Sequence, residues 1–187
     1  MTSVILVRHA ESDRSVADEA ARPLSQRGHT QASNLISLFN NRPIDCIYCS
    51  PYRRALQTLQ PLADHRGLKI GVIDDFRERL VGQWEANFDA YSRRQWADFS
   101  FKKDGGDCLS EVQVRNIRAL ERILLESVGK NVLIGTHGTA MSLIVNHYDP
   151  TFEYEGFRSI SNIMPYIAKL TFNRLRFVSI GEIALQP

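Results

Sequence analysis

The sequence has few cysteines, little net charge and no long apolar run. Its three cysteines are odd in number and too few for a disulfide framework, which favours a reducing cytoplasm. Lys and Arg total 23 against 21 for Asp and Glu, and a net charge of +2 gives no basis for nucleic-acid or membrane-surface binding. No apolar stretch approaches the ~20 residues that span a bilayer. Residues 1–8 lack the basic start and long apolar core of a secretory signal.

The 187 residues have instead the composition of one globular domain, with 43% hydrophobic and 24% charged residues. Short, largely β-branched apolar runs are typical of strands that are buried on both faces. These runs lie at residues 4–7, 46–49, 70–73 and 132–134. Longer segments with helical spacing separate them. We therefore predict an α/β fold with three αβα layers around a mostly parallel central sheet.

Helix starts are predicted from capping residues. Ser25 precedes a segment with apolar residues at helical spacing, and Ser110 precedes another. Ser50-Pro51 is an N-cap residue followed by a proline at the first helical position, which predicts a further start. One more helix is expected to begin just after His137.

Two segments depart from this alternation. Residues 167–172 and 175–180 are rich in β-formers, and Asn173-Arg174 between them predicts an antiparallel C-terminal hairpin. Residues 85–107 are the least regular part of the chain and are rich in aromatic residues, among them Trp96. We predict that they form a lid-like insertion in a single domain spanning 1–187. These aromatics either contact a planar or apolar group of a substrate or only pack the lid onto the domain.

Two histidines follow predicted buried strands. Arg8-His9 follows the first strand directly, and His137-Gly138-Thr139 leads from a later strand into a helix. Because the carboxyl ends of parallel strands line one crevice, the two turns are expected to face a common pocket. An arginine, imidazoles and the first N–H groups of a helix suit a phosphate. The alternative is a surface arginine with two structural histidines.

Two arginines and a glutamate extend this pattern. Arg53 and Arg54 fall in the first turn of a predicted helix, where cations are disfavoured unless an anion binds there. Glu78 follows the 70–73 strand after a short loop and is expected near the same edge of the sheet. Like-charge repulsion from a phosphate would favour its protonated form, as a general acid requires. The alternative is that one or both arginines point to solvent and that Glu78 forms a solvated ion pair.

The Cys46–Cys49 pair has the spacing of a CxxC motif, but it lies in a predicted strand. Residues three apart on a strand point to opposite faces, so we interpret both cysteines as core residues. No cluster has the spacing of zinc or magnesium ligands, and no metal site is predicted.

Taken together, these segments resemble the histidine phosphatase superfamily, also called the phosphoglycerate mutase-like family. The resemblance covers nearly the whole chain and implies the phosphoglycerate mutase-like fold. The matching segments are Arg8-His9-Ala10-Glu11-Ser12, Pro23-Leu24-Ser25 with Gly28, Gln31 and Ala32, Ser50-Pro51-Tyr52-Arg53-Arg54-Ala55-Leu56-Gln57-Thr58, Glu78 with Gly82, Trp84 and Glu85, Gly106-Asp107 through Arg115, Thr136-His137-Gly138, and Asn162 before the final strands. The match at 50–55 selects Arg54 over Arg53 as the residue of the site.

The resemblance implies a role for each matching residue. His9 is expected to be the nucleophile that attacks phosphorus and forms a phosphohistidine. Arg8, Arg54 and His137 are expected to hold the phosphoryl oxygens. Glu78 is expected to protonate the leaving alkoxide and then to activate water. No metal and no other cofactor is implied.

Further residues are expected around the phosphate. Ser12 is expected near the phosphoryl group, and Gly138 and Thr139 offer backbone N–H groups. Ser15 stands where many members carry an asparagine that binds phosphate. Ala10 replaces the usual glycine, so an ordinary backbone conformation is expected there.

The function implied is a metal-independent phosphoric monoester hydrolase of the histidine acid phosphatase type. Its partners would be a small phosphorylated metabolite as substrate and inorganic phosphate as product. Mutases of the family look longer, and a shorter chain leaves the pocket open to water, which favours hydrolysis. The alternatives are a phosphoglycerate-type phosphomutase and a non-catalytic protein that binds a phosphorylated ligand.

Overall fold

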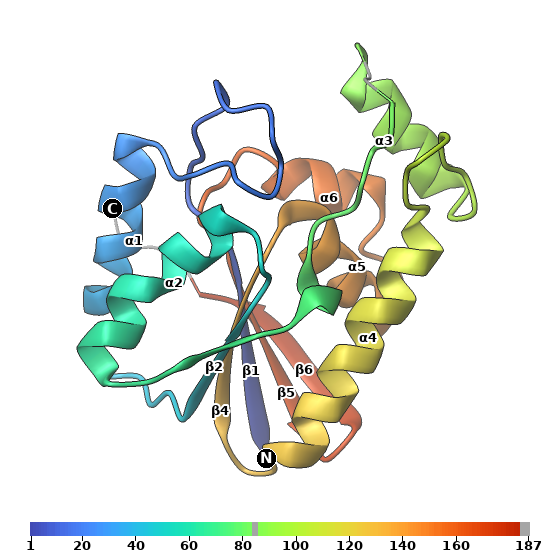
Figure 1. Cartoon of the computed structure of the whole chain (residues 1–187). Coiled ribbons are helices and arrows are strands. Elements are labelled where there is room, and N and C mark those ends of the chain that lie inside the picture. The colour runs from blue at the N-terminus through green and yellow to red at the C-terminus, as the bar shows by residue number, and fades with distance from the viewer. Residues whose placement is uncertain (84–85, 184–187) are drawn as a thin grey trace.

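The computed structural model describes residues 1–83 and 86–183 (Figure 1). Trp84 and Glu85 of the matching motif lie outside the described residues. No helix of the described part has the length and apolarity to cross a bilayer. The elements are β1 Thr2–Arg8, α1 Gln26–Phe39, β2 Cys46–Cys49, α2 Arg53–Arg66, β3 Ile70–Val72, the 3-10 turn η1 Asp74–Phe76, α3 Phe88–Ala97, α4 Leu109–Glu126, β4 Asn131–Thr136, α5 Gly138–Tyr148, α6 Tyr154–Ile160, β5 Ile167–Asn173 and β6 Arg176–Glu182.

The strands form one sheet in the order β3-β2-β4-β1-β5-β6. β3, β2, β4 and β1 run parallel to one another, whereas β5 pairs antiparallel with β1 and β6 antiparallel with β5. The predicted mostly parallel sheet and C-terminal hairpin are thus confirmed. Asn173 pairs with Arg176, so the hairpin turn is Arg174-Leu175, one residue later than predicted. Arg174 supplies the left-handed conformation of that turn, with φ 55°.

Helices cover both faces of the sheet and give the predicted three layers. Val4 and Leu6 of β1 pack with the apolar residues of α4 and α5, whereas Ile5 and Val7 pack with those of α1 and α2. Successive residues of a strand point to opposite faces. The unbroken apolar run of β1 therefore has both sides buried, and Figure 1 shows α1 and α2 on one side and α4 on the other.

Two predicted helix starts are confirmed. The Ser25 hydroxyl caps α1 by accepting the N–H of Gly28 at 3.0 Å. α5 begins directly after His137, which occupies its N-cap position.

The predicted start of α2 at Ser50 is wrong. α2 begins at Arg53, and its N-cap position falls on Tyr52. The hydroxyl of Ser50 lies 2.7 Å from Nε2 of His137, 87 residues away in sequence. The Ser50 oxygen that the local pattern predicts as the cap of α2 therefore contacts His137 instead.

The predicted cap of α4 at Ser110 is also wrong. The N-cap residue is Cys108, whose N–H donates to the Glu111 carboxylate at 3.0 Å. That carboxylate is fixed from the other side by Lys102, with Nζ at 2.6 Å. A glutamate at the third helical position can serve the N-cap from within the helix, which moved the start two residues upstream.

The 85–107 segment contains a helix, α3, that the sequence did not indicate. Trp96 on α3 stacks on Phe157 of α6 with ring centroids 5.7 Å apart, and it is 9% exposed. It belongs to a cluster with Leu109 and Val112 of α4. Of the two roles weighed for Trp96, the structure therefore shows packing. The seven-residue α6 was not predicted either.

Gly28 fixes how α1 meets the segment after His9. A β-carbon at this position would lie 2.0 Å from the carbonyl oxygen of Glu11, which itself accepts the N–H of Ser25 at 2.9 Å. In an unhindered helix, alanine would stabilise relative to glycine by about 1 kcal/mol. Here a rigid backbone atom blocks the methyl group. We expect Gly28→Ala to lower the free energy of unfolding by about 1–3 kcal/mol.

Chemical denaturation with a far-UV signal measures this effect. Ser33→Ala on the exposed face of the same helix is the matched control and should change stability by no more than about 0.5 kcal/mol. A Gly28→Ala protein as stable as the parent, or more stable, would contradict the expected clash.

Candidate active site

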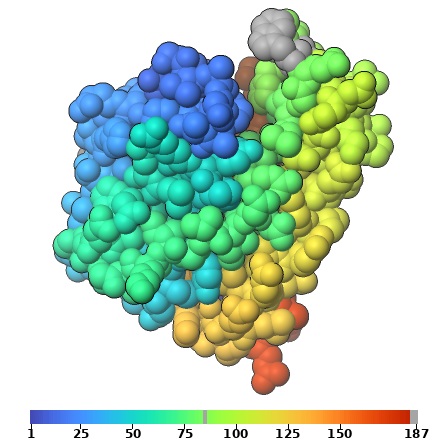
Figure 2. Space-filling view, in the orientation of Figure 1, coloured from blue at the N-terminus to red at the C-terminus, as the bar shows by residue number. Residues whose placement is uncertain are grey.

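Three neighbouring strands end at one edge of the sheet, and each is followed by a polar residue of the candidate site. His9 follows β1, His137 follows β4 and Ser50 follows β2. The N–H of His9 donates to the carbonyl of Thr136 at 3.0 Å, and that of Ser50 to the carbonyl of Gly135 at 2.9 Å. The rings of His9 and His137 have centroids 5.3 Å apart. In Figure 2 the surface is hollowed between the segment after β1 (blue) and the segment near α3 (green).

His9 is held as a neutral imidazole. Its Nδ1 lies 2.7 Å from the carbonyl oxygen of Ala10. A carbonyl oxygen only accepts, so Nδ1 carries the proton and Nε2 keeps its lone pair. Burial, followed by the charge of Arg54, lowers the pKa of His9 to about 3. Since Arg174 is the one non-glycine residue of the described chain with positive φ, Ala10 has the ordinary backbone predicted for it.

His137 is fully buried and its two ring nitrogens differ. Nε2 lies 2.7 Å from Oγ of Ser50, and that oxygen already accepts the N–H of Tyr52 at 3.2 Å. The Ser50 hydroxyl can donate to Nε2 or accept from it, and when it donates, the imidazole proton lies on Nδ1. Within the described residues Nδ1 is buried without a partner. Burial, then the charge of Arg54, holds the pKa of His137 well below its usual range.

Arg8 is anchored through one nitrogen and leaves another unpaired. Nη1 donates to the carbonyl oxygens of Ile160 and Ser161 at 2.7 and 2.8 Å, where α6 ends. Nε is buried and has no partner in the described part of the chain. A side-chain carbon at Gly138 would lie 3.3 Å from this Nε. The guanidinium of Arg8 therefore lies against the first residue of α5.

Arg54 projects from the first turn of α2 and its side chain is only 3% exposed. Its guanidinium lies over the ring of Tyr52, 5.1 Å from the centroid. Nη2 pairs with the Glu19 carboxylate at 3.1 Å, and Nη1 donates to the Glu19 carbonyl. The neighbouring Arg53 is exposed. Of the two arginines, Arg54 is thus the one directed into the protein.

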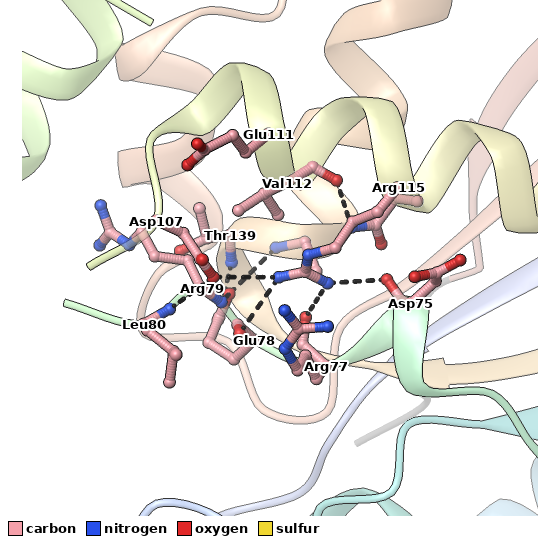
Figure 3. Close-up of polar contacts among 12 residues, drawn as sticks. Asp75, Arg77, Glu78, Arg79, Leu80, Asp107, Glu111, Val112, Arg115 and Thr139 are labelled. Atoms are coloured by element: carbon pink, nitrogen blue, oxygen red, sulfur yellow. Dashed lines mark hydrogen bonds and ion pairs between the residues drawn. The ribbon is translucent and has the colours of Figure 1, made fainter. Parts of the chain in front are cut away.

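Glu78 lies at the N-terminus of α5 (Figure 3). Its carboxylate accepts the N–H groups of Thr139 at 3.0 Å, Ala140 at 3.2 Å and Arg79 at 2.9 Å. These first N–H groups of α5 have no partner within the helix. We predicted from the sequence that the N–H of Thr139 is available to a phosphate. In this structure it donates to Glu78 instead.

The loop that carries Glu78 is fastened by Arg115 of α4 (Figure 3). Nη1 of Arg115 donates to the carbonyls of Asp75 and Arg77 at 2.7 and 2.8 Å. Nη2 lies 3.5 Å from the Asp107 carboxylate. Arg115 belongs to one of the matching segments, but the match gave it no role and did not indicate which groups it contacts.

Ser12 and Ser15 are not joined to this cluster by a described contact. Ser12 forms an isolated antiparallel bridge with Leu24. Ser15 is exposed, and its hydroxyl donates to Oδ1 of Asp13 at 2.7 Å.

Thr58, Ser50 and Glu19 contact the cluster, although the sequence gave them no role there. Thr58 accepts the N–H of Ala10 at 2.9 Å. Ser50 and Thr58 are the two ends of the matching segment 50–58, in which they had no assigned role, and nothing in the sequence indicated Glu19.

The cysteines and the acidic residues of the described chain form no metal site. Cys46, Cys49 and Cys108 are free thiols; in β2, Cys49 is buried as predicted, whereas Cys46 is only half-buried. No group of three or more His, Cys, Asp or Glu side chains in residues 1–83 and 86–183 is arranged to hold a metal ion.

The low pKa of His9 predicts how stability depends on pH. Between about pH 3 and pH 6.5 the unfolded chain binds a proton at His9 that the native chain excludes. This contribution is complete above pH 6.5 and is lost as the pH falls. At 1.36 kcal/mol per pKa unit, it amounts to about 3 kcal/mol between pH 6.5 and pH 4. Between pH 6.5 and pH 4, the free energy of unfolding of the parent should therefore fall by about 3 kcal/mol more than that of His9→Ala.

Urea titrations at pH 6.5, 5 and 4 measure the two slopes. His29→Ala on the exposed side of α1 is the matched control. Parallel curves for the parent and His9→Ala would show that His9 is not held neutral.

Comparisons with known proteins show the family of the chain. A family model of the histidine phosphatase superfamily (branch 1) matches residues 4–180. The adenosylcobalamin/alpha-ribazole phosphatase of Salmonella typhimurium is 28% identical over 153 residues, covering 75% of this chain and 76% of that protein. Phosphoserine phosphatase 1 of Hydrogenobacter thermophilus is 29% identical over 154 residues, covering 75% and 73%.

The fold is shared with solved structures. Bacillus stearothermophilus YhfR superposes with a TM-score of 0.79 at 21% identity over 95% of both chains. A mutant phosphoserine phosphatase from Entamoeba histolytica in complex with phosphoserine superposes with a TM-score of 0.78 at 20% identity over 98% of both. With the family match over residues 4–180, these likenesses confirm the predicted resemblance: the chain belongs to the histidine phosphatase superfamily, branch 1.

Proposed function

We propose that the protein is a metal-independent phosphomonoesterase that acts through a phosphohistidine at His9. The observation that carries the proposal is that two buried nitrogens, Nε of Arg8 and Nδ1 of His137, have no hydrogen-bond partner among the described residues. Leaving a buried donor unpaired costs about 1–3 kcal/mol. The oxygens of a phosphoryl group would satisfy both donors, and Arg54 adds a further charge.

Each group has one role in the proposed chemistry. Nε2 of His9 attacks phosphorus while the bond to the ester oxygen breaks. That oxygen takes a proton from Glu78, whose protonated form the negative charge of the bound phosphate favours. Arg8, Arg54 and His137 hold the three remaining oxygens, over which negative charge is spread. Water then attacks the phosphohistidine and gives a proton to Glu78. Inorganic phosphate forms, and the electron pair of the N–P bond returns to Nε2.

Other residues complete the proposed pocket. Gly138 brings backbone close to Arg8 and the phosphoryl group, and Ser12 stays a candidate for its neighbourhood. Binding through Ser15 or through the Thr139 N–H requires each to exchange the partner described above. We further propose a single domain over 1–187, with residues 85–107 as its lid-like insertion.

The substrate class is a small phosphorylated metabolite. The named relatives, an alpha-ribazole phosphatase and a phosphoserine phosphatase, support hydrolysis over transfer between hydroxyls. The free thiols of Cys46, Cys49 and Cys108 support a cytoplasmic location.

Phosphate release from a broad panel of phosphorylated metabolites tests the proposal. Turnover is expected to survive EDTA and to be inhibited by vanadate, which imitates five-coordinate phosphorus. Loss of activity with EDTA would contradict the metal-independent mechanism. Isomerisation of 3-phosphoglycerate that depends on a bisphosphoglycerate primer, with little phosphate released, would identify a mutase. Binding of phosphorylated ligands with no turnover of any panel member would identify a binding protein.

A further inference from the structure

Glu19 lies between two arginines at the candidate site. Oε2 of its carboxylate is 3.1 Å from Nη2 of Arg54, and Oε1 is 2.8 Å from Nη1 of Arg22. Its backbone carbonyl accepts a hydrogen bond from Nη1 of Arg54. Both terminal nitrogens of Arg54 are thus in contact with this one residue.

The two partners differ in how firmly they are held. The side chain of Arg54 is 3% exposed and comes from the first turn of α2. The side chain of Glu19 is 51% exposed and comes from the irregular segment between β1 and α1. Its carboxylate can therefore move into water, whereas the guanidinium stays in place.

Arg22 holds the second oxygen of the Glu19 carboxylate. Its Nε donates to the carbonyl of Val16 at 2.8 Å, which fixes the guanidinium within the same segment. Its positive charge contributes to the low pKa of His9. Arg22 and Arg54 together hold the carboxylate of Glu19, and the charges of both lower the pKa of His9.

A phosphoryl group and a carboxylate bind the same kind of hydrogen-bond donor. Both accept charge-assisted hydrogen bonds from guanidinium groups, and like charges at one position repel each other. A phosphate that binds Arg54 must therefore displace the carboxylate of Glu19. The free energy needed to displace Glu19 lowers the affinity of the site for every oxyanion, including the product phosphate.

We propose that Glu19 competes with phosphoryl groups for Arg54 and thereby weakens the binding of oxyanions, inorganic phosphate included, at the site. This inference rests on the proposed function in so far as Arg54 binds the phosphoryl group. The opposing possibility is a positioning role, in which Glu19 orients Arg54 for the ligand. The two roles predict opposite changes in affinity.

Glu19→Gln removes the charge and keeps the size of the side chain. Calorimetric titration with inorganic phosphate, and separately with vanadate, should show binding about ten-fold tighter than in the parent, the equivalent of one ion-pair contact. Asp18→Asn is the matched control. It removes a neighbouring charge, while an amide oxygen can still accept the N–H groups of Ala20 and Ala21, which bond Asp18 now. Its affinity for both anions should change less than about two-fold.

Each outcome decides between the roles. Unchanged or weaker binding of both anions by Glu19→Gln overturns the inference, and weaker binding indicates positioning. Equal tightening by Asp18→Asn also overturns it, because general electrostatics would then suffice. Thermal unfolding verifies that both variants are folded. Since titration needs no turnover, a protein that hydrolyses nothing but binds phosphate more tightly after Glu19→Gln would refute the proposed function and retain this inference.

Discussion

Alanine at position 9 is expected to abolish both the phosphoenzyme and turnover. The only group we assign to attack phosphorus is Nε2 of His9, whose lone pair is left free by the Nδ1 contact with Ala10. Without a nucleophile the two-step path is closed, and kcat should fall by on the order of 10⁴-fold or more. Brief incubation with a ³²P-labelled substrate, followed by quenching, should label the parent on histidine. That label is expected to be stable in alkali and labile in acid.

The oxyanion site should survive this substitution. Arg8, Arg54 and His137 remain, so His9→Ala is expected still to bind vanadate or phosphate. His65→Ala, at an exposed position in the last turn of α2, is the matched control and should keep full labelling. Histidine labelling that persists in His9→Ala would move the nucleophile elsewhere.

Glutamine in place of Glu78 is expected to impair hydrolysis according to the leaving group. Positioned proton transfer contributes about 10²–10⁴-fold to such reactions. For an alkyl phosphate, whose alkoxide leaves only with a proton, kcat/KM should fall by about that factor. For p-nitrophenyl phosphate, whose phenolate leaves unprotonated, kcat/KM should change little. Because Glu78 is also assigned to activate water, the phosphohistidine should accumulate in the variant.

Comparing kcat/KM for the two substrates, with rapid-quench measurement of the phosphoenzyme, separates these effects. Asp75→Asn, which changes a carboxylate on the same loop, is the control: only the backbone carbonyl of Asp75 bonds Arg115. An equal loss on both substrates after Glu78→Gln would indicate a disturbed α5 N-terminus instead of a lost proton donor.

The parts of the site that depend on neighbouring sequence were predictable. Buried apolar runs indicated β1 and β4. Because the carboxyl ends of parallel strands lie at one edge of the sheet, the proximity of His9 and His137 could be predicted from the sequence. The cap at Ser25 and the start of α5 were readable for the same reason. Each depends on a few consecutive residues.

The parts that depend on distant contacts were not predictable. Ser50 looks like a helix cap until His137, 87 residues later, is brought within 2.7 Å of it. The contact of Glu78 with the start of α5 spans 61 residues, and nothing near Glu19 in sequence indicates that it meets Arg54. The seven residues of α6 are too few for a helical period to stand out.

The anchoring of Arg8 to the end of α6 has a consequence for motion. The last carbonyls of a helix have no partner within it, and Arg8 supplies one to Ile160 and to the next residue, Ser161. Unwinding of the C-terminal end of α6 and movement of the Arg8 side chain are therefore coupled, because both break the same hydrogen bonds. By thermodynamic linkage, an anion that immobilises Arg8 must also slow amide hydrogen exchange at the α6 terminus.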